Sequence, residues 1–454
     1  MELQNKANSL WGNFFKLDMP QIRAFHMTWF AFFLCFFAWF GIAPLMPVVR
    51  QELGLTQSQV GWSIIASVAA TILARLVVGW LCDRIGPRRA YTWLLILGSL
   101  PVMGIGLAHD FQTFLIFRLM IGAIGASFVI TQYHTSVMFA PNCVGTANAT
   151  SAGWGNLGGG VTQFVMPLVF AAFVTLFGFS EAVGWRASMF VAGAVCFLSG
   201  IAYYRFTQDA PEGNFKELRA QGKMPAGKHA DGAFWQALKD PRVWSLFVIY
   251  GACFGIELTI NNIAALYFTD YFGLGLTAAG FTAASFGLMN LFARTLGGVF
   301  GDKFALLWGL KGRVTWLFIA LFCEGLALML FSQMTALAVA LPALIIFSLF
   351  VQMSEGATYS VVPFVNKKAL GAVAGIVGAG GNAGAVAAGF LFKGGIAWPT
   401  ALLVLGSLVT LSSFLAFTVR FATADEKAAE ADFRSALAKQ EGQRPAELMP
   451  AYDL

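Results

Sequence analysis

Long hydrophobic stretches separated by short polar segments run from one end of the chain to the other. A bilayer core about 30 Å thick is crossed by a helix of roughly 20 apolar residues, so each stretch of that length predicts a transmembrane helix. The pattern predicts an all-α integral membrane protein with 12 transmembrane helices. Their expected ranges are 25–48, 59–82, 90–108, 112–138, 146–176, 186–206, 243–268, 276–301, 314–334, 336–362, 370–392 and 399–420.

Charged residues are scarce: they make up 11% of the 454 residues, whereas hydrophobic residues make up 58%. A soluble domain carries about 25% charged residues, so we expect a chain embedded in lipid. The six cysteines stand singly, and the chain contains no nucleotide-binding loop, zinc spacing or nucleophile motif. We therefore expect no enzymatic activity, no cofactor and no metal.

The basic residues follow the predicted loops unevenly. Both tails and the loops on their side of the membrane carry 23 Lys or Arg, whereas the opposite loops carry three. Basic residues accumulate on the cytoplasmic side, so we expect a multi-pass protein of the cytoplasmic (inner or plasma) membrane with both termini in the cytoplasm. This distribution accounts for the pI of about 9.0 without a nucleic-acid partner.

A polar segment near the middle divides the chain. Residues 207–242 contain several prolines and glycines among charges, which is typical of a linker. We expect a six-helix half at 1–206, a cytoplasmic linker at 207–242, a second six-helix half at 243–420 and a cytoplasmic tail at 421–454. Thr423 and Glu426 form a capping-box pattern, which predicts a surface helix in the tail.

The two halves share sequence patterns at nearly half-chain spacing. Arg75-x-x-x-Gly79-x-x-x-Asp83 returns 219 residues later as Arg294-x-x-x-Gly298-x-x-x-Asp302. Glycine followed eleven residues later by asparagine occurs at Gly145 and Asn156, and again at Gly371 and Asn382. Repeated halves of this kind predict a pseudo-symmetric transporter with its site where the halves meet.

These motifs resemble those of a known family. The loop pattern Gly79-x-x-x-Asp83-Arg84-x-Gly86-x-Arg88-Arg89 and the pattern Arg118-x-x-x-Gly122 are similar to motifs of the major facilitator superfamily. The glycine-rich segments around Asn156 and Asn382 resemble the paired signatures of its nitrate/nitrite porter family, in the high-affinity nitrate transporter branch. The resemblance implies a major facilitator fold and a cytoplasmic gate formed by Gly79, Asp83, Arg84 and Arg88.

Three arginines, Arg75, Arg118 and Arg294, stand inside predicted helices. An arginine at mid-membrane costs about 2.5–3.5 kcal/mol on insertion scales, so Arg75 and Arg294 need a partner. Neither has an acid one turn away on its own helix, and we expect two converging, unpaired guanidinium groups that form an anion site. Their forked donors suit a small planar oxyanion, and the resemblance implies that they hold nitrate or nitrite. We expect a structural role for Arg118.

Other candidates surround this pair. The resemblance points to Phe128 and Tyr359 as rings against the anion, with Phe350 as the competitor of Tyr359, and we add Tyr250 as a hydroxyl donor. Each aromatic residue can also serve in packing alone. We expect anion or gating contacts for Asn156 and Asn382. The signature glycines, expected to let helices approach closely, are Gly153, Gly155, Gly158, Gly380, Gly381 and Gly384.

Acids in the apolar stretches suggest coupling to protons. Glu257, Glu355 and Glu324 are the candidates, with Glu257 placed first and Glu355 second. Import of an anion into a negative-inside cell works against about 2.3 kcal/mol per 100 mV, which proton symport overcomes. We expect a monomeric protein that imports nitrate by alternating access and that can also accept nitrite. The alternatives are a nitrate/nitrite exchanger, an organic-anion facilitator and a transporter-like sensor.

Overall fold

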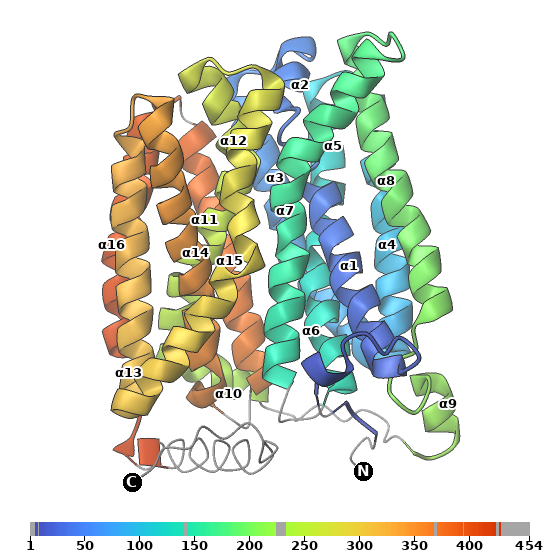
Figure 1. The fold of residues 1–454 in the computed structure, drawn as a ribbon, viewed down its shortest axis with the longest axis vertical. Helices are drawn as coiled ribbons and strands as arrows, with labels where there is room; N and C mark the ends of the chain where they lie inside the picture. The colour runs from blue at the N-terminus through green and yellow to red at the C-terminus, as the bar shows by residue number, and fades with distance from the viewer. Residues whose placement is uncertain are drawn as a thin grey trace, which may run out of the picture.

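Helices account for nearly all of the computed structural model, which describes residues 5–7, 9–139, 144–223, 233–366, 370–393, 395–423 and 426–427. Within these residues there is no β-strand beyond isolated bridges. Most helices run along the long axis of the molecule (Figure 1). Eleven helices of the described part are long and apolar enough to cross a membrane. The predicted helix at 59–82 corresponds to a further one, α3, of 29 residues.

The first half contains the helices that precede the central polar segment. In chain order they are α1 (Pro20–Phe40), α2 (Met46–Glu52), α3 (Gln57–Ile85), α4 (Pro87–Gly104), α5 (Phe111–Ile121), α6 (Ser127–Met138), α7 (Val144–Thr175) and α8 (Glu181–Phe206). Short 3-10 turns are η1 (Trp11–Asn13), η2 (Ile105–Leu107) and η3 (Gly122–Ala126).

The second half follows two short helices, α9 (Phe215–Ala220) and α10 (Ala233–Lys239), which fall in the predicted linker. Its helices are α11 (Pro241–Phe272), α12 (Leu276–Leu288), α13 (Ala293–Ser332), α14 (Leu337–Val365), α15 (Leu370–Lys393) and α16 (Trp398–Ser413), with the 3-10 turns η4 (Met289–Leu291) and η6 (Phe414–Thr418). The predicted tail helix lies outside the described residues.

Two predicted spans, at 112–138 and 276–301, are confirmed as Phe111–Met138 and Leu276–Ala305 but contain breaks, and one predicted helix is too long. The helix expected at 25–48 ends at Phe40, because turns lead to Pro44 and a new helix, α2, starts beside Pro47. The helix expected at 112–138 is interrupted by the 3-10 turn η3. The helix expected at 276–301 breaks at η4 and Phe292, so that Arg294 lies in the first turn of α13.

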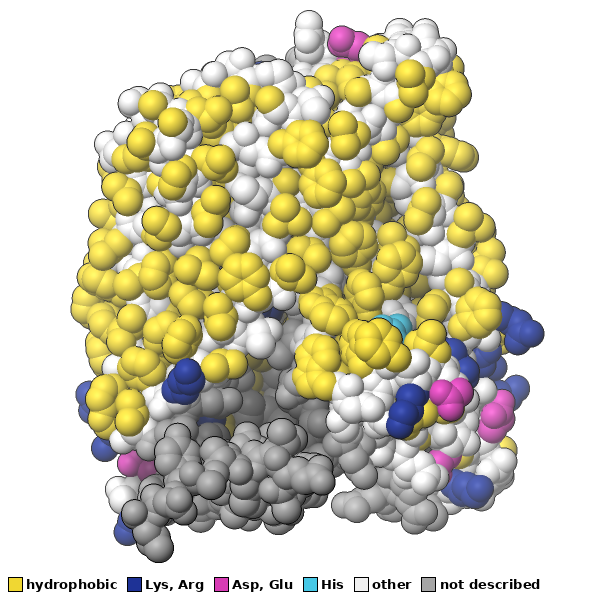
Figure 2. Space-filling model, in the orientation of Figure 1, with side chains coloured by type: hydrophobic (Ala, Val, Ile, Leu, Met, Phe, Trp, Pro, Cys, Tyr) yellow, Lys and Arg dark blue, Asp and Glu magenta, His cyan; other side chains and the backbone are white. Residues whose placement is uncertain are grey.

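The surface divides into an apolar body and a charged end. Hydrophobic side chains cover the upper and middle parts of the face in Figure 2, and most Lys, Arg, Asp and Glu side chains gather at the lower end. Both termini lie at this end in Figure 1. Leu73, Leu198 and Leu411 are among the large apolar side chains that remain exposed. Such a surface is expected for a body surrounded by lipid.

Glycines bring the helices into close contact. In α7, Gly155 and Gly158 lie against Phe32 and Phe33 of α1, whereas Gly153 faces the Asn290 carbonyl. The signature glycines of α15 lie against Phe247, Gly251 and Phe254 of α11. Across the halves, α7 meets α12 where a Cβ on Gly160 would lie 2.5 Å from the carbonyl carbon of Gly287. Packing thus explains the signature glycines, because a side chain there would collide with the neighbouring helix.

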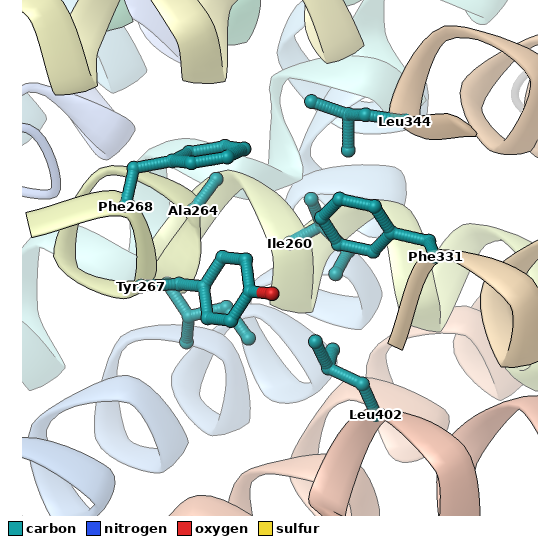
Figure 3. Close-up of a pocket in the computed structure, with 8 residues that line it drawn as sticks. Ile260, Ala264, Tyr267, Phe268, Phe331, Leu344 and Leu402 are labelled. Carbon is teal, nitrogen blue, oxygen red and sulfur yellow. The ribbon is translucent and has the colours of Figure 1, made fainter. Parts of the chain in front are cut away.

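A small void remains in the second half, between α11, α13, α14 and α16 (Figure 3). Its volume is about 10 Å³, enough for about one water molecule. The hydroxyl of Tyr267 points into the space between Phe331 and Leu402 and has no hydrogen-bond partner in the described residues. The other side chains around the void are apolar. A water there would have one polar partner, fewer than a buried water ordinarily has, so the void is a poor water site.

Candidate anion site

Arg75 offers an unoccupied pair of donors in the interior of the protein. Its side chain is buried in α3, and Nη1 donates to the carbonyl oxygen of Gly378 at 2.9 Å. Nε and Nη2 are buried without a partner in the described part of the chain. These two atoms form one edge of the planar guanidinium, which binds two oxygens of an oxyanion in parallel. The rings of Phe128 and Phe254 lie 5.6 and 5.7 Å from the guanidinium carbon.

Two further polar groups lie at or near Gly378, the residue that accepts the hydrogen bond of Arg75 Nη1. A Cβ on Gly378 would be 3.1 Å from the Tyr359 hydroxyl and 3.8 Å from Arg75 Nη1, so both side chains meet at this glycine. Asn382 follows one helical turn later, is fully buried, and has neither amide atom hydrogen bonded within the described residues. Buried amides ordinarily have partners, so the orphaned donor and acceptor fit a site that binds a polar ligand.

The expectation that Arg294 is unpaired is wrong. Its Nη1 forms an ion pair with Oε2 of Glu355, and its Nη2 donates to the Tyr250 hydroxyl at 3.0 Å. The search along a single helix could not find this partner, because Glu355 belongs to α14 and Arg294 to α13. Of the two repeat-related arginines, Arg75 alone keeps a free edge among the described contacts.

Aromatic side chains join the two arginines. The Tyr250 ring meets the Tyr359 ring edge-on at 5.0 Å and 77°, and it stacks on Phe254 at 5.2 Å and 16°. Contacts therefore run from Arg294 through Tyr250 and Tyr359 to Arg75. Tyr359, and not its competitor Phe350, is the α14 aromatic residue in these contacts. Phe350 packs against the hydrophobic core, and its carbonyl accepts a hydrogen bond from Ser354.

A carboxyl cluster adjoins Arg294. Glu257 in α11 is fully buried and accepts hydrogen bonds from Asn290 Nδ2 at 2.7 Å and from Asn156 Nδ2 at 3.4 Å. Its carboxyl faces that of Glu355, whose Oε1 has no other partner in the described part. Asn290 was not predicted as a site residue, although its position four residues before Arg294 was a usable signal.

The third acid, Glu324, lies apart from Arg294. It is fully buried in α13, and neither carboxyl oxygen has a hydrogen-bond partner by geometry within the described residues. The Ser354 side chain is its neighbour, but that hydroxyl donates to the Phe350 carbonyl. Glu324 thus adjoins the cluster without contacting the arginine.

An open cavity of about 860 Å³ extends to Arg294 and Tyr359. Arg294, Phe128 and Tyr359 line it, together with Trp11, Arg313 and residues near the terminal end of α6, α7 and α14. We call the end of the molecule that bears both termini the cavity end. No acidic side chain is among the described residues that line the cavity.

The opposite end, which we call the far end, is closed by bonds between the halves. Arg50 in α2 forms a two-point ion pair with Asp270 in α11 at 2.6 and 2.7 Å. Deeper in the protein, Gln163 of α7 donates to the Asn261 carbonyl at 2.7 Å. At the far end, α11 thus contacts the first half through both bonds.

The predicted gate motif is described in part. The backbone N–H of Arg88 donates to Asp209 at 2.8 Å, and its guanidinium donates to the Tyr204 carbonyl, so Arg88 is bound to the end of α8 and to the segment after it. Burial raises the pKa of Asp209, and hydrogen bonds from the N–H groups of Phe215 and Arg88 oppose that rise. Gly79, Asp83 and Arg84 belong to α3, but their surroundings lie outside the described residues. No cluster of three metal-ligating side chains occurs among the described residues.

The fold and the site define a helical membrane carrier. Its buried arginine site lies at the interface of two repeated halves. The sequence profile of the Major Facilitator Superfamily matches residues 28–366. The chain belongs to this superfamily and is a transporter, not an enzyme.

Its similarity to curated proteins is extensive. The chain is 40% identical over 395 residues to the high affinity nitrate transporter 2.5 of Arabidopsis thaliana, covering 86% of this chain and 77% of that one. It is 38% identical over 400 residues to the high-affinity nitrate transporter 2.3 of Oryza sativa subsp. japonica, covering 87% and 76%. It is 30% identical over 431 residues to the nitrate/nitrite transporter NrtP of Nostoc punctiforme, covering 80% and 85%.

Solved structures share the fold at lower identity. A bacterial homolog of the human lysosomal transporter Spinster, in an inward-facing and unoccupied conformation, aligns with a TM-score of 0.65 at 15% identity, covering 94% of this chain and 99% of that one. The nucleoside transporter NupG aligns with a TM-score of 0.64 at 13% identity, covering 87% and 99%. These two likenesses concern the fold alone.

Proposed function

We propose that this protein imports nitrate, and also nitrite, across the cytoplasmic membrane by alternating access. The free Nε and Nη2 edge of Arg75 is the observation that carries the proposal, because it is a planar, two-donor site with no protein acceptor among the described residues. The nitrate transporter names of the relatives support the same substrate.

Nitrate fits the chemistry of this edge. Two of its oxygens accept from the Arg75 fork in the guanidinium plane, and the third oxygen faces other donors, such as Asn382 Nδ2 and the Tyr359 hydroxyl. The rings of Phe128 and Phe254 keep water away from the ion, which strengthens its attraction to the guanidinium. A lysine in place of Arg75 would keep the charge but lose the paired donors.

The arrangement of contacts supports an alternating-access cycle. The cavity reaches Arg294 and Tyr359 from the cavity end, and bonds through α11 close the far end. With both termini in the cytoplasm, as the basic loops indicate, this state faces the cytoplasm. The opposite state requires the α11 contacts to separate and the cavity end to close.

Coupling to protons follows from the charges at the site. With Arg75 and Arg294 charged and Glu257 and Glu355 ionised, the cluster is neutral, so an added anion leaves one uncompensated negative charge. A proton on Glu355 restores neutrality and frees Arg294 for the anion. A second proton on Glu257 makes the loaded site positive, so that a negative-inside potential favours import. We therefore place Glu355, which contacts Arg294 directly, ahead of Glu257 as the first proton carrier.

The decisive experiment is counterflow of isotopic nitrate in proteoliposomes, with nitrite, chloride and formate as competitors. We expect nitrate flux that nitrite inhibits and chloride does not, and an Arg75→Lys variant that is inactive. Arg186→Lys is the matched control, because Arg186 is a partly exposed arginine whose partner is Glu52 at 2.6 Å. Normal flux by Arg75→Lys contradicts the assignment.

An organic-anion carrier is the second candidate, and the size of the cavity favours it. A volume of about 860 Å³ lies in the range of sites that bind small organic molecules. Inhibition by formate and larger carboxylates, without nitrate flux, identifies that function. Nitrate binding without flux identifies a sensor, and flux that requires internal nitrite identifies an exchanger.

A further inference from the structure

A second arginine without a carboxylate partner is buried between the halves, on the far side of the candidate site. Arg118 lies in the last turn of α5 and is fully buried. Its Nη2 donates to Asn262 Oδ1 at 2.9 Å and its Nη1 to the Trp39 carbonyl at 3.5 Å, whereas Nε has no partner in the described part of the chain. All of its described partners are therefore neutral.

Such an arrangement needs an explanation in physical terms. Burying a charge costs several kcal/mol, and a carboxylate with good geometry normally offsets part of that cost. At the rim of the same interface, Arg50 has such a carboxylate partner in Asp270. At the deeper, fully buried position, the chain provides an amide from Asn262.

The partner of Arg118 belongs to the other half. Asn262 is on α11, and α5 is in the first half, so opening of the far end separates the two side chains. Arg118 would then face the newly opened space with one weak carbonyl contact and a free fork. A guanidinium in a narrow, poorly hydrated opening attracts a small anion strongly.

The position of Arg118 also places it on the way to Arg75. Gly122, one turn after Arg118, packs against Ser67 of α3, and the Thr71 hydroxyl donates to the Gly122 carbonyl at 2.6 Å. Arg75 follows Thr71 by one further turn of α3. Contacts along α3 therefore lead from the level of Arg118 to that of Arg75.

We propose that Arg118 is a second anion-binding residue, which receives the small oxyanion when the carrier is open at the far end and which Asn262 covers when that end is closed. This assignment rests on the proposed function, since it takes the same anion as ligand. The neutrality of Asn262 is essential, because a carboxylate at this position would compete with the incoming anion for the guanidinium.

Asn262→Asp tests the proposal, because it supplies that competing carboxylate with little change in size. Asn261→Asp is the matched control: Asn261 is the adjacent buried residue of α11, and neither atom of its side-chain amide is hydrogen bonded within the described residues. Nitrate flux is measured in oriented proteoliposomes from each side. For Asn262→Asp we expect the KM at the far-end side to rise at least tenfold, and the KM at the cavity side to stay within twofold. The control should leave the far-end KM within twofold.

Separate effects on KM and kcat distinguish an anion-binding role of Arg118 from a merely structural role. If Asn262→Asp lowers kcat and leaves both KM values unchanged, Arg118 only closes the far end and the proposal is overturned. If the Asp variant does not insert, Arg118→Lys keeps the charge and loses the fork. It should raise the far-end KM, and an unchanged value overturns the proposal. If the parent protein transports no nitrate, the proposed function itself is refuted. The results for the variants alone cannot refute it.

Discussion

The carboxylate of Glu355 forms an ion pair with the guanidinium of Arg294. One of the two central arginines is therefore already paired with an anionic side chain of the protein. Arg75, the other one, keeps its Nε and Nη2 edge without a protein acceptor in the described residues. The repeat-related arginines thus differ in state: one is open to a ligand and the other is held by a carboxylate. A substrate anion that needs both must displace Glu355 or arrive when Glu355 is protonated.

Glu355→Gln should therefore strengthen nitrate binding, because the amide leaves Arg294 without an ionic partner. We expect about a tenfold lower Kd, equivalent to about 1.4 kcal/mol, and a Kd that depends less on pH than that of the parent. Isothermal titration of the purified protein with nitrate between pH 5 and 8 measures both effects.

Glu324→Gln is the control for this measurement. Glu324 is as deeply buried as Glu355 but has no ion pair with Arg294 among the described contacts. Its variant should bind nitrate with the parent's pH dependence. Weaker binding by Glu355→Gln would mean that the carboxylate organises Arg294 for the anion and does not compete with it.

Gly378→Ala should weaken transport without unfolding the protein. The new methyl group would lie 3.1 Å from the Tyr359 hydroxyl, which must shift by a few tenths of an ångström, and 3.8 Å from Arg75 Nη1, which is an ordinary van der Waals contact. We expect a several-fold higher KM for nitrate flux. Gly375→Ala, one turn earlier in α15, has no atom within 4 Å of the added group and should behave as the parent. Equal KM values for the two variants would remove Gly378 from the site.

Arg75 and Arg294 could be selected as candidate site residues from sequence, because each places a charge in an apolar stretch. The cost of burying a guanidinium depends only on the residue and its own helix. The ion pair of Arg294 could not be predicted in the same way, since its partner is 61 residues away on another helix. The break at η3 likewise depends on tertiary contacts: Gly122 approaches Ser67, and Gly125 approaches the Trp39 ring. The hydrophobic pattern predicted the helices, but their interruptions depend on what packs against them.

Tyr267→Phe should leave transport unchanged and stabilise the protein slightly. The hydroxyl points into the small void with no hydrogen-bond partner in the described part, so its removal eliminates an unsatisfied buried group. We expect a gain of about 1 kcal/mol or less, seen as a higher Tm in detergent. Tyr203→Phe is the contrasting variant, because the Tyr203 hydroxyl bonds Thr28 and His134, and its loss should lower the Tm. A lower Tm for Tyr267→Phe would mean that the hydroxyl has a partner.

Asn382→Ala should separate stability from function. Both amide atoms of Asn382 are buried without a partner in the described residues, and such a group costs about 1–3 kcal/mol when it stays unsatisfied. Removing it should therefore keep or raise the Tm, while nitrate flux falls at least tenfold because a donor to the anion is lost. Asn156→Ala is the informative comparison, since Asn156 donates to Glu257 at 3.4 Å. It should reduce flux through the carboxyl cluster and alter the pH profile, which Asn382→Ala should not. If Asn382→Ala lowers the Tm and keeps full flux, its amide is structural, and the third oxygen of nitrate must find its donor elsewhere.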